Sequence, residues 1–203
     1  MPLINIDNLD KIIDLINDGG VGIIPTETVY GIVCKANNDD AIDRIYEIKG
    51  RASNQPLQVL IAEPHDMHKY MNNEILANKL VNYWPGSLTA VVATDDLSSQ
   101  EISDKLIYEG GVGLRCPNDE LARMIIERVG GAVAATSANI SKEAPSNDPA
   151  IINNVFENQL MILDDGVRNN VTGSTVISYI TDPPSLIRQG VLSDNIIQDL
   201  MEL

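Results

Sequence analysis

The sequence has few cysteines and no long apolar run. Only 2 of its 203 residues are cysteine, Cys34 and Cys116, and they form no CxxC pair. This spacing argues against a disulfide framework and a zinc site, and it favours a reducing compartment. No apolar stretch approaches the roughly 20 residues needed to span a bilayer. The N-terminal stretch MPLINIDNLDKII lacks the basic segment and long apolar core of a signal peptide. We therefore expect a soluble, cytoplasmic protein without a membrane segment.

Basic residues are scarce, with 14 Lys and Arg against 29 Asp and Glu and a formal net charge of −15. Tight binding to a phosphate backbone depends on clustered Lys and Arg, because it is driven by counterion release. The composition therefore argues against tight direct binding to nucleic acid. Any site for an anionic ligand must gather the few cations locally, so their positions are informative.

The order of the periodic segments predicts one α/β domain over residues 1–203, with a twisted mixed sheet flanked by helices. Helices are expected after Asn8, from Asp39 or Asp40 to Lys49, in two short segments before the WPG motif, after Asp119, and at the C-terminal end. Residues 141–150, SKEAPSNDPA, have the composition of a mobile loop. Strands are expected at 3–6, 21–25, 57–62, 88–93, 112–116, 132–139, 161–163, 175–180 and 186–187.

Hydroxyl-rich clusters follow three of these predicted strands: PTET, TSAN and GST. Four cations, Lys49, Arg51, Arg115 and Arg188, lie at element boundaries, and Arg115 is expected to emerge beside Pro117. Ligands of open α/β sheets bind at strand ends, so the pattern predicts a site for an anionic ligand, with phosphates. Simpler interpretations stay open, since Lys and Arg also complement helix dipoles, and Thr, Ser and Asn also close turns. Neither a GxxxxGK[ST] loop nor a GxGxxG fingerprint is present.

Seven motifs in order, PTETVYG, KGR followed by PL, WPG with LT, VGLRCP, TSANIS, GSTVI and RQG, closely resemble the YrdC-type threonylcarbamoyl-AMP synthase family in its short form. The resemblance implies a twisted mixed sheet that encloses a basic cavity. It also implies the reaction of L-threonine, bicarbonate or CO2, and ATP with Mg²⁺ to threonylcarbamoyl-AMP and pyrophosphate. Partner tRNA threonylcarbamoyl-transferase proteins would then modify adenosine 37 of tRNA.

The same resemblance assigns roles to individual residues. Lys49 and Arg51 would act on the nucleotide phosphates and be catalytic. Thr26, Tyr30, Arg115 and Ser174 would bind threonine, with a bidentate contact between Arg115 and the carboxylate. Glu27 is either an outer Mg²⁺ ligand, a partner of the amine, or an exposed charge at a strand end. The remaining nucleotide-binding residues would be Ser53, Ser137, Asn139 and Arg188.

The sequence also departs from the family pattern. Leu60 stands where histidine is common, Gln55 where Asn or Lys is common, and Ala52 where proline is common. The substitution at Leu60 leaves the preferred amino acid open. Two other functions also remain open at this point: a non-catalytic nucleotide- or RNA-binding paralogue, and a carbamoyl-handling domain of a hydrogenase-maturation protein. The intact KGR and TSAN motifs favour the enzyme.

Overall fold

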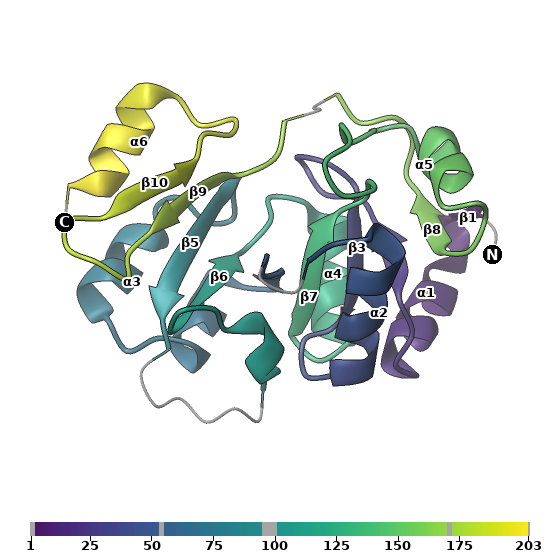
Figure 1. Ribbon diagram of the computed structural model, residues 1–203, viewed down its shortest axis with the longest axis horizontal. Coiled ribbons are helices and arrows are strands. Elements are labelled where there is room, and N and C mark those ends of the chain that lie inside the picture. The colour runs from purple at the N-terminus through teal and green to yellow at the C-terminus, as the bar shows by residue number, and fades with distance from the viewer. Residues whose placement is uncertain (1–2, 53–54, 95–100, 170–171, 203) are drawn as a thin grey trace.

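A 10-stranded mixed sheet runs through the computed structural model, which describes residues 3–52, 55–94, 101–169 and 172–202. The strand order is β1-β8-β2-β3-β7-β4-β6-β5-β9-β10. In Figure 1, α3 and α6 lie near the end of the sheet that holds β5, β9 and β10, whereas α1, α2 and α5 lie toward the other end. The strands are β1 Leu3–Asn5, β2 Gly22–Ile24, β3 Gly31–Lys35, β4 Gln58–Ile61, β5 Leu88–Ala93, β6 Gly111–Arg115, β7 Ala132–Ser137, β8 Met161–Asp164, β9 Thr175–Ser178 and β10 Ser185–Arg188.

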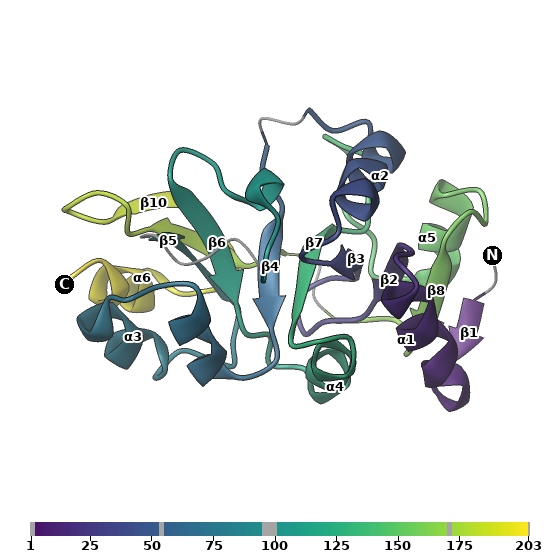
Figure 2. The ribbon, with the colours of Figure 1, turned by 90° about the horizontal axis from the view of Figure 1, so that it is seen from below.

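The helices lie between these strands and at the C-terminal end of the chain (Figure 2). Three short segments, Ile6–Asn8, Pro64–Lys69 and Asp104–Leu106, are 3-10 helices. Together with the sheet, the helices confirm the predicted fold class. The α-helices are α1 Leu9–Asn17, α2 Asp39–Lys49, α3 Glu74–Leu80, α4 Glu120–Arg128, α5 Pro149–Val155 and α6 Asp194–Met201.

Helix α2 illustrates how local sequence signals fix an element. The side chain of Asn38 accepts a hydrogen bond from the backbone N–H of Ala41, which caps the first turn. Gly50 ends the helix in the left-handed conformation, with φ of 58°. Ile42 and Ile45 are fully buried. Lys49 and Arg51 therefore lie at the C-terminal end of the helix, as the sequence predicts, and contact the end of the central strand β7.

Among the described strands and α-helices, β3 and α5 were not predicted. β3 pairs antiparallel with both β2 and β7, and its sequence GIVCK follows a turn of six residues rather than a short Gly-rich hairpin loop. α5 begins inside the stretch expected to be a loop, at Pro149, and continues beyond it to Val155. Its start carries a recognisable signal, because Asp148 accepts from the N–H of Ala150 and Pro149 occupies the first turn. The prediction of a loop through residue 150 is therefore wrong at its end.

The two faces of the sheet bury different cores. Side chains from α2, α3, α5 and α6 pack on one face, and side chains from α1 and α4 pack on the other. On the α1 and α4 face, the described core residues come from β1, β2, β3, β4, β7 and β8, and none comes from β5, β6, β9 or β10. On this face, the latter strands carry the buried polar residues Arg115 and Thr89 beside glycines and valines. Buried polar side chains in a part of the face that no helix core covers mark this half as a candidate binding surface.

Both cysteines are free and buried, and burial raises the pKa of Cys34 and of Cys116 to about 12. They behave as small apolar side chains, as expected from the sequence. Within the described ranges, no helix has the length and apolarity required to cross a bilayer. The described residues likewise contain no group of three or more His, Cys, Asp or Glu side chains placed to hold a metal ion.

Candidate active site

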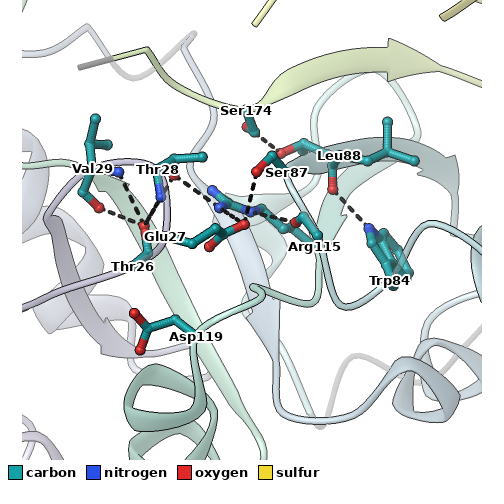
Figure 3. Close-up of polar contacts among 12 residues, drawn as sticks. Thr26, Glu27, Thr28, Val29, Trp84, Ser87, Leu88, Arg115, Asp119 and Ser174 are labelled. Atoms are coloured by element: carbon teal, nitrogen blue, oxygen red, sulfur yellow. Dashed lines mark hydrogen bonds and ion pairs between the residues drawn. The ribbon is translucent and has the colours of Figure 1, made fainter. Parts of the chain in front are cut away.

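A buried ion pair joins the turn after β2 to the end of β6 (Figure 3). Arg115 Nη2 lies 2.7 Å from Glu27 Oε1, with the two side chains 3% and 19% exposed. Ser87 Oγ donates to the same carboxylate oxygen at 3.0 Å. Glu27 Oε2 is buried without a hydrogen-bond partner. Two expectations are therefore corrected: Arg115 does not emerge beside Pro117, and Glu27 is not an exposed charge at a strand end.

The guanidinium of Arg115 is held in place by further contacts. Its Nη2 donates to Thr28 Oγ1 at 2.9 Å, and its Nε donates to the carbonyl of Gly86 at 3.2 Å. Nη1 has no partner among the described residues, so its two N–H groups remain to donate to a ligand. The sequence could not reveal this burial, because it depends on the turn 25–30 folding against the end of β6.

Thr26 shapes that turn. Its Oγ1 donates to the carbonyl of Val29 at 2.6 Å and accepts from the backbone N–H groups of Thr28 and Val29, each at 3.3 Å. A hydroxyl that bonds the backbone two and three residues later closes a turn of the type that Thr and Ser favour. Thr26 is only 3% exposed. Its observed contacts position Thr28 and Glu27, and its predicted contact with threonine stays a prediction.

Tyr30 faces a different part of the chain. Its hydroxyl donates to the carbonyl of Gly166 at 2.8 Å and accepts from the N–H of Asp165 at 3.1 Å. Burial raises the pKa of this phenol. Both hydrogen bonds attach the turn after β8 to the start of β3. The structure therefore does not bring the Tyr30 hydroxyl into the group formed by Arg115, Glu27 and Ser87, and its predicted role in binding threonine stays a prediction.

Ser174 and Arg188 lie together beside β5. The Nε and Nη2 of Arg188 donate to the carbonyl of Ser174 at 3.1 and 2.9 Å, and Nη2 also donates to Ser174 Oγ at 3.2 Å. Ser174 Oγ is 2.8 Å from Thr89 Oγ1, and Ser174 is 1% exposed. Burial, followed by the nearby charges of Arg115 and Arg51, lowers the pKa of Arg188. The three guanidinium groups are thus close enough to interact.

Lys49 holds the turn after β7. Its Nζ donates to the carbonyl of Ser137 at 2.5 Å, to the carbonyl of Asn139 at 2.7 Å, and to Asn139 Oδ1 at 3.4 Å. The side chain is almost fully buried. Desolvation, with a smaller effect from Arg51, lowers the pKa of Lys49 to about 8. Lys49, Ser137 and Asn139 therefore meet as the motifs suggested, although all three ammonium donors face internal acceptors.

Arg51 links this group to the rest of the site. It donates to Thr136 Oγ1 on β7 at 3.3 Å, and to the carbonyls of Gln55 and Pro56 at 2.8 and 3.1 Å. Through Arg51, four cations from three separate parts of the chain interact: Lys49 and Arg51 after α2, Arg115 on β6 and Arg188 on β10. An enclosed basic cavity around this cluster stays a prediction. Ser53, expected to contact the nucleotide, lies outside the described residues.

Several polar residues of the site were not singled out from the sequence. Thr28 contacts Arg115, Thr89 contacts Ser174, and Gln58 accepts from Thr89 Oγ1 at 2.8 Å. Thr28 belonged to the PTET cluster and Thr89 to the WPG motif with LT, but neither was given a role. Gln58 interrupts an otherwise apolar strand, which was the available signal. Leu60, on the same face of β4, is 1% exposed and packs in the α1 and α4 core.

The fold and the site define an α/β domain in which cations and hydroxyls from several strand ends lie together. The Sua5/YciO/YrdC sequence profile, described as "Telomere recombination", matches residues 14–190. The chain belongs to this family.

Relatives of known name and structure agree with this assignment. The chain is similar to the threonylcarbamoyl-AMP synthase of Bacillus subtilis, with 33% identity over 188 residues that cover 91% of this chain and 54% of the relative. Among solved structures, Pyrococcus abyssi Sua5 complexed with L-threonine has 29% identity and a TM-score of 0.89, covering 100% of this chain and 61% of that one. Escherichia coli YciO, at 22% identity and a TM-score of 0.82, covers 92% of this chain and 91% of its own and shares the fold. The chain spans about half the length of the first curated relatives it matches.

Proposed function

We propose that this protein is an L-threonylcarbamoyladenylate synthase, a nucleotidyltransferase that converts L-threonine, bicarbonate or CO2, and ATP into threonylcarbamoyl-AMP and pyrophosphate. The observation that carries the proposal is the convergence of Arg51, Arg115 and Arg188 in a chain of net charge −15. A cluster of like charges is unfavourable unless an anion neutralises it. Membership of the family and the named relatives support the choice of reaction.

In this proposal, the Arg115 region receives the amino acid. Nη1 of Arg115 has no partner among the described residues, so its N–H groups can donate to the substrate carboxylate. Glu27, paired with that guanidinium, is placed beside the amine of the same substrate. Ser87 fixes the carboxylate of Glu27 by donating to Oε1. The pair thus offers one cation and one anion at close separation, as an α-amino acid requires.

The nucleotide would lie against Arg51, Arg188 and the turn held by Lys49. Lys49 fixes the carbonyls of Ser137 and Asn139, so it orients the turn and adds positive charge behind it. Mg²⁺ would enter as part of the MgATP substrate, bound mainly by phosphate oxygens and water. These cations offset the charge that develops on the departing pyrophosphate, which is the main electrostatic demand of the reaction.

The chemistry needs two bond-forming steps. The neutral amine of threonine attacks CO2, forms a C–N bond and loses a proton, which yields a carbamate. A carbamate oxygen then attacks the α-phosphorus of ATP, while the bond between the α-phosphorus and the bridging oxygen breaks and pyrophosphate leaves. Both reactants are anions, so catalysis depends on fixing them in line against their repulsion. Fixed cations perform this task without a nucleophilic residue.

We extend the proposal to the cell. The product would be consumed by tRNA threonylcarbamoyl-transferase proteins in the cytoplasm, and the acidic chain itself would not bind tRNA tightly.

The test of the synthase reaction is incubation of the purified protein with ATP, Mg²⁺ and bicarbonate, with and without L-threonine. Threonine-dependent pyrophosphate release is expected. ATP binding without release would instead favour the non-catalytic paralogue.

A further inference from the structure

An unassigned polar side chain, Gln58, lies on the same sheet face as α1 and α4, at the border of the part that their core does not cover. Along β4, Val59 and Ile61 belong to the core beneath α2 and α3, so Gln58 and Leu60 point to the opposite face. Along β5, Leu88 and Ala90 belong to that same core, which places Thr89 on the face of Gln58. Gln58 and Thr89 therefore share the polar surface of the candidate site.

A relay of hydrogen bonds orients the amide of Gln58. Arg188 Nη2 donates to Ser174 Oγ at 3.2 Å, Ser174 Oγ lies 2.8 Å from Thr89 Oγ1, and Thr89 Oγ1 donates to Gln58 Oε1 at 2.8 Å. A guanidinium can only donate, so the relay can run in one direction and end on the amide oxygen. The amide Nε2 then carries two N–H donors, and it has no partner among the described residues.

Gly113 makes this relay possible. It lies on β6, between β4 and β5 in the sheet. A Cβ at this position would lie 3.3 Å from Thr89 Cγ2 and 3.7 Å from Gln58 Cβ. Without a side chain at Gly113, the amide of Gln58 reaches across β6 and bonds Thr89. The free Nε2 is thereby held near the start of β5.

The same segment of β5 connects Gln58 with the ion pair. Ser87 donates to Glu27 Oε1, and Thr89, two residues later, donates to Gln58. Glu27 in turn pairs with Arg115. A cation, an anion and a neutral amide donor are therefore gathered around residues 87–89. These groups match the carboxylate, amine and side-chain hydroxyl of a hydroxy amino acid.

We infer that Gln58 Nε2 donates a hydrogen bond to the side-chain hydroxyl of the amino-acid substrate and so determines the preference for a hydroxy amino acid. Thr89 is a positioning residue, because it acts on the substrate only through Gln58. The inference rests on the proposed function and adds to it the residue that selects the side chain. A site built to bond a hydroxyl rejects an analogue that lacks it, since the donor is then left unpaired.

The test compares L-threonine with L-2-aminobutyrate, which lacks only the hydroxyl. Wild type and Gln58→Met are measured by amino-acid-dependent pyrophosphate release and by calorimetric binding of each amino acid. Gln58→Met is expected to lower kcat/KM for threonine by about tenfold to a hundredfold, with a change of less than about threefold for aminobutyrate. The KM for ATP should stay unchanged. Thr89→Val should weaken the preference for threonine in the same direction, but less.

Gln159→Met is the matched control, because Gln159 is exposed and remote from the site. It should leave both substrates unaffected. If Gln58→Met leaves the ratio of kcat/KM for threonine to kcat/KM for aminobutyrate unchanged, the inference is wrong but the proposed function stands. The same holds if the variant raises only the KM for ATP. If wild type binds neither amino acid by calorimetry, the inference and the proposed function fall together. Thermal unfolding of each variant separates a binding defect from loss of the fold.

Discussion

The buried pair of Arg115 and Glu27 predicts a coupling energy well above that of an exposed pair with the same geometry. Arg128 Nη2 lies 2.7 Å from Asp10 Oδ1, the same separation as Arg115 Nη2 and Glu27 Oε1. The exposed pair has side chains 45% and 76% exposed, against 3% and 19% for the buried pair. Attraction at fixed distance scales inversely with the dielectric constant, which falls about fourfold from water to an effective protein value of about 20. An exposed pair contributes about 0.5 kcal/mol, so the buried pair should contribute about 2 kcal/mol.

A double-mutant cycle measures this difference. Arg115→Met and Glu27→Gln should each lower the free energy of unfolding by about 3 kcal/mol, because each leaves an uncompensated buried charge. The contacts of Arg115 with Thr28 and Gly86 are lost in both Arg115 variants, so they cancel in the coupling energy. Urea unfolding with a constant m-value gives the four free energies. Coupling below about 0.5 kcal/mol, or equal to that of a parallel cycle on Arg128 and Asp10, would refute the reasoning.

Three further predictions concern the cation cluster. Lys49→Ala should lower synthase turnover about a hundredfold, as expected for loss of one preorganised charge, and near-normal pyrophosphate release would contradict its role. Arg115→Lys should raise the half-saturating concentration of threonine more than that of ATP in steady-state kinetics. A larger effect on ATP would instead mean that Arg115 lies in the nucleotide half of the site. The pKa of Lys49, lowered to about 8 from 10.5 by burial, means that the unfolded chain binds more protons between these values. The free energy of unfolding should therefore rise with pH across that window, by about 2 kcal/mol between pH of about 8 and about 9.5 relative to Lys49→Met. If the urea midpoints of wild type and Lys49→Met change in parallel with pH, this prediction is wrong.

The sequence predicted elements wherever local signals and burial agreed. α2 carried an Asn cap, an apolar face and a terminal Gly50, and all three occur in the structure. α5 carried a cap at Asp148 and proline at the first turn. The polar composition of residues 141–150 nevertheless favoured a loop, and the capping signal was given too little weight. β3 had no short turn to mark its hairpin. Its pairing with β7 depends on contacts about a hundred residues apart in sequence, which no local pattern encodes.

For the candidate site, the sequence predicted which motifs meet but not how their side chains are engaged. Lys49, Ser137 and Asn139 came together as expected, whereas the internal hydrogen bonds of Lys49 follow from the path of the chain after β7. The burial of Arg115 depends on the turn around Glu27, which alternation along β6 cannot reveal. The orientation of Gln58 depends on Thr89 and Gly113, which lie beside it in the fold but far from it in the sequence.

The bare backbone at Gly113 has a consequence for how such a protein could diverge. A single methyl group there would crowd Thr89, whose hydroxyl orients Gln58, while leaving every charge in the site untouched. Substrate choice would then shift through bulk alone, at a position that bears no functional group. Comparisons of binding motifs would overlook such a change, because Gly113 has no side chain that could contact a ligand.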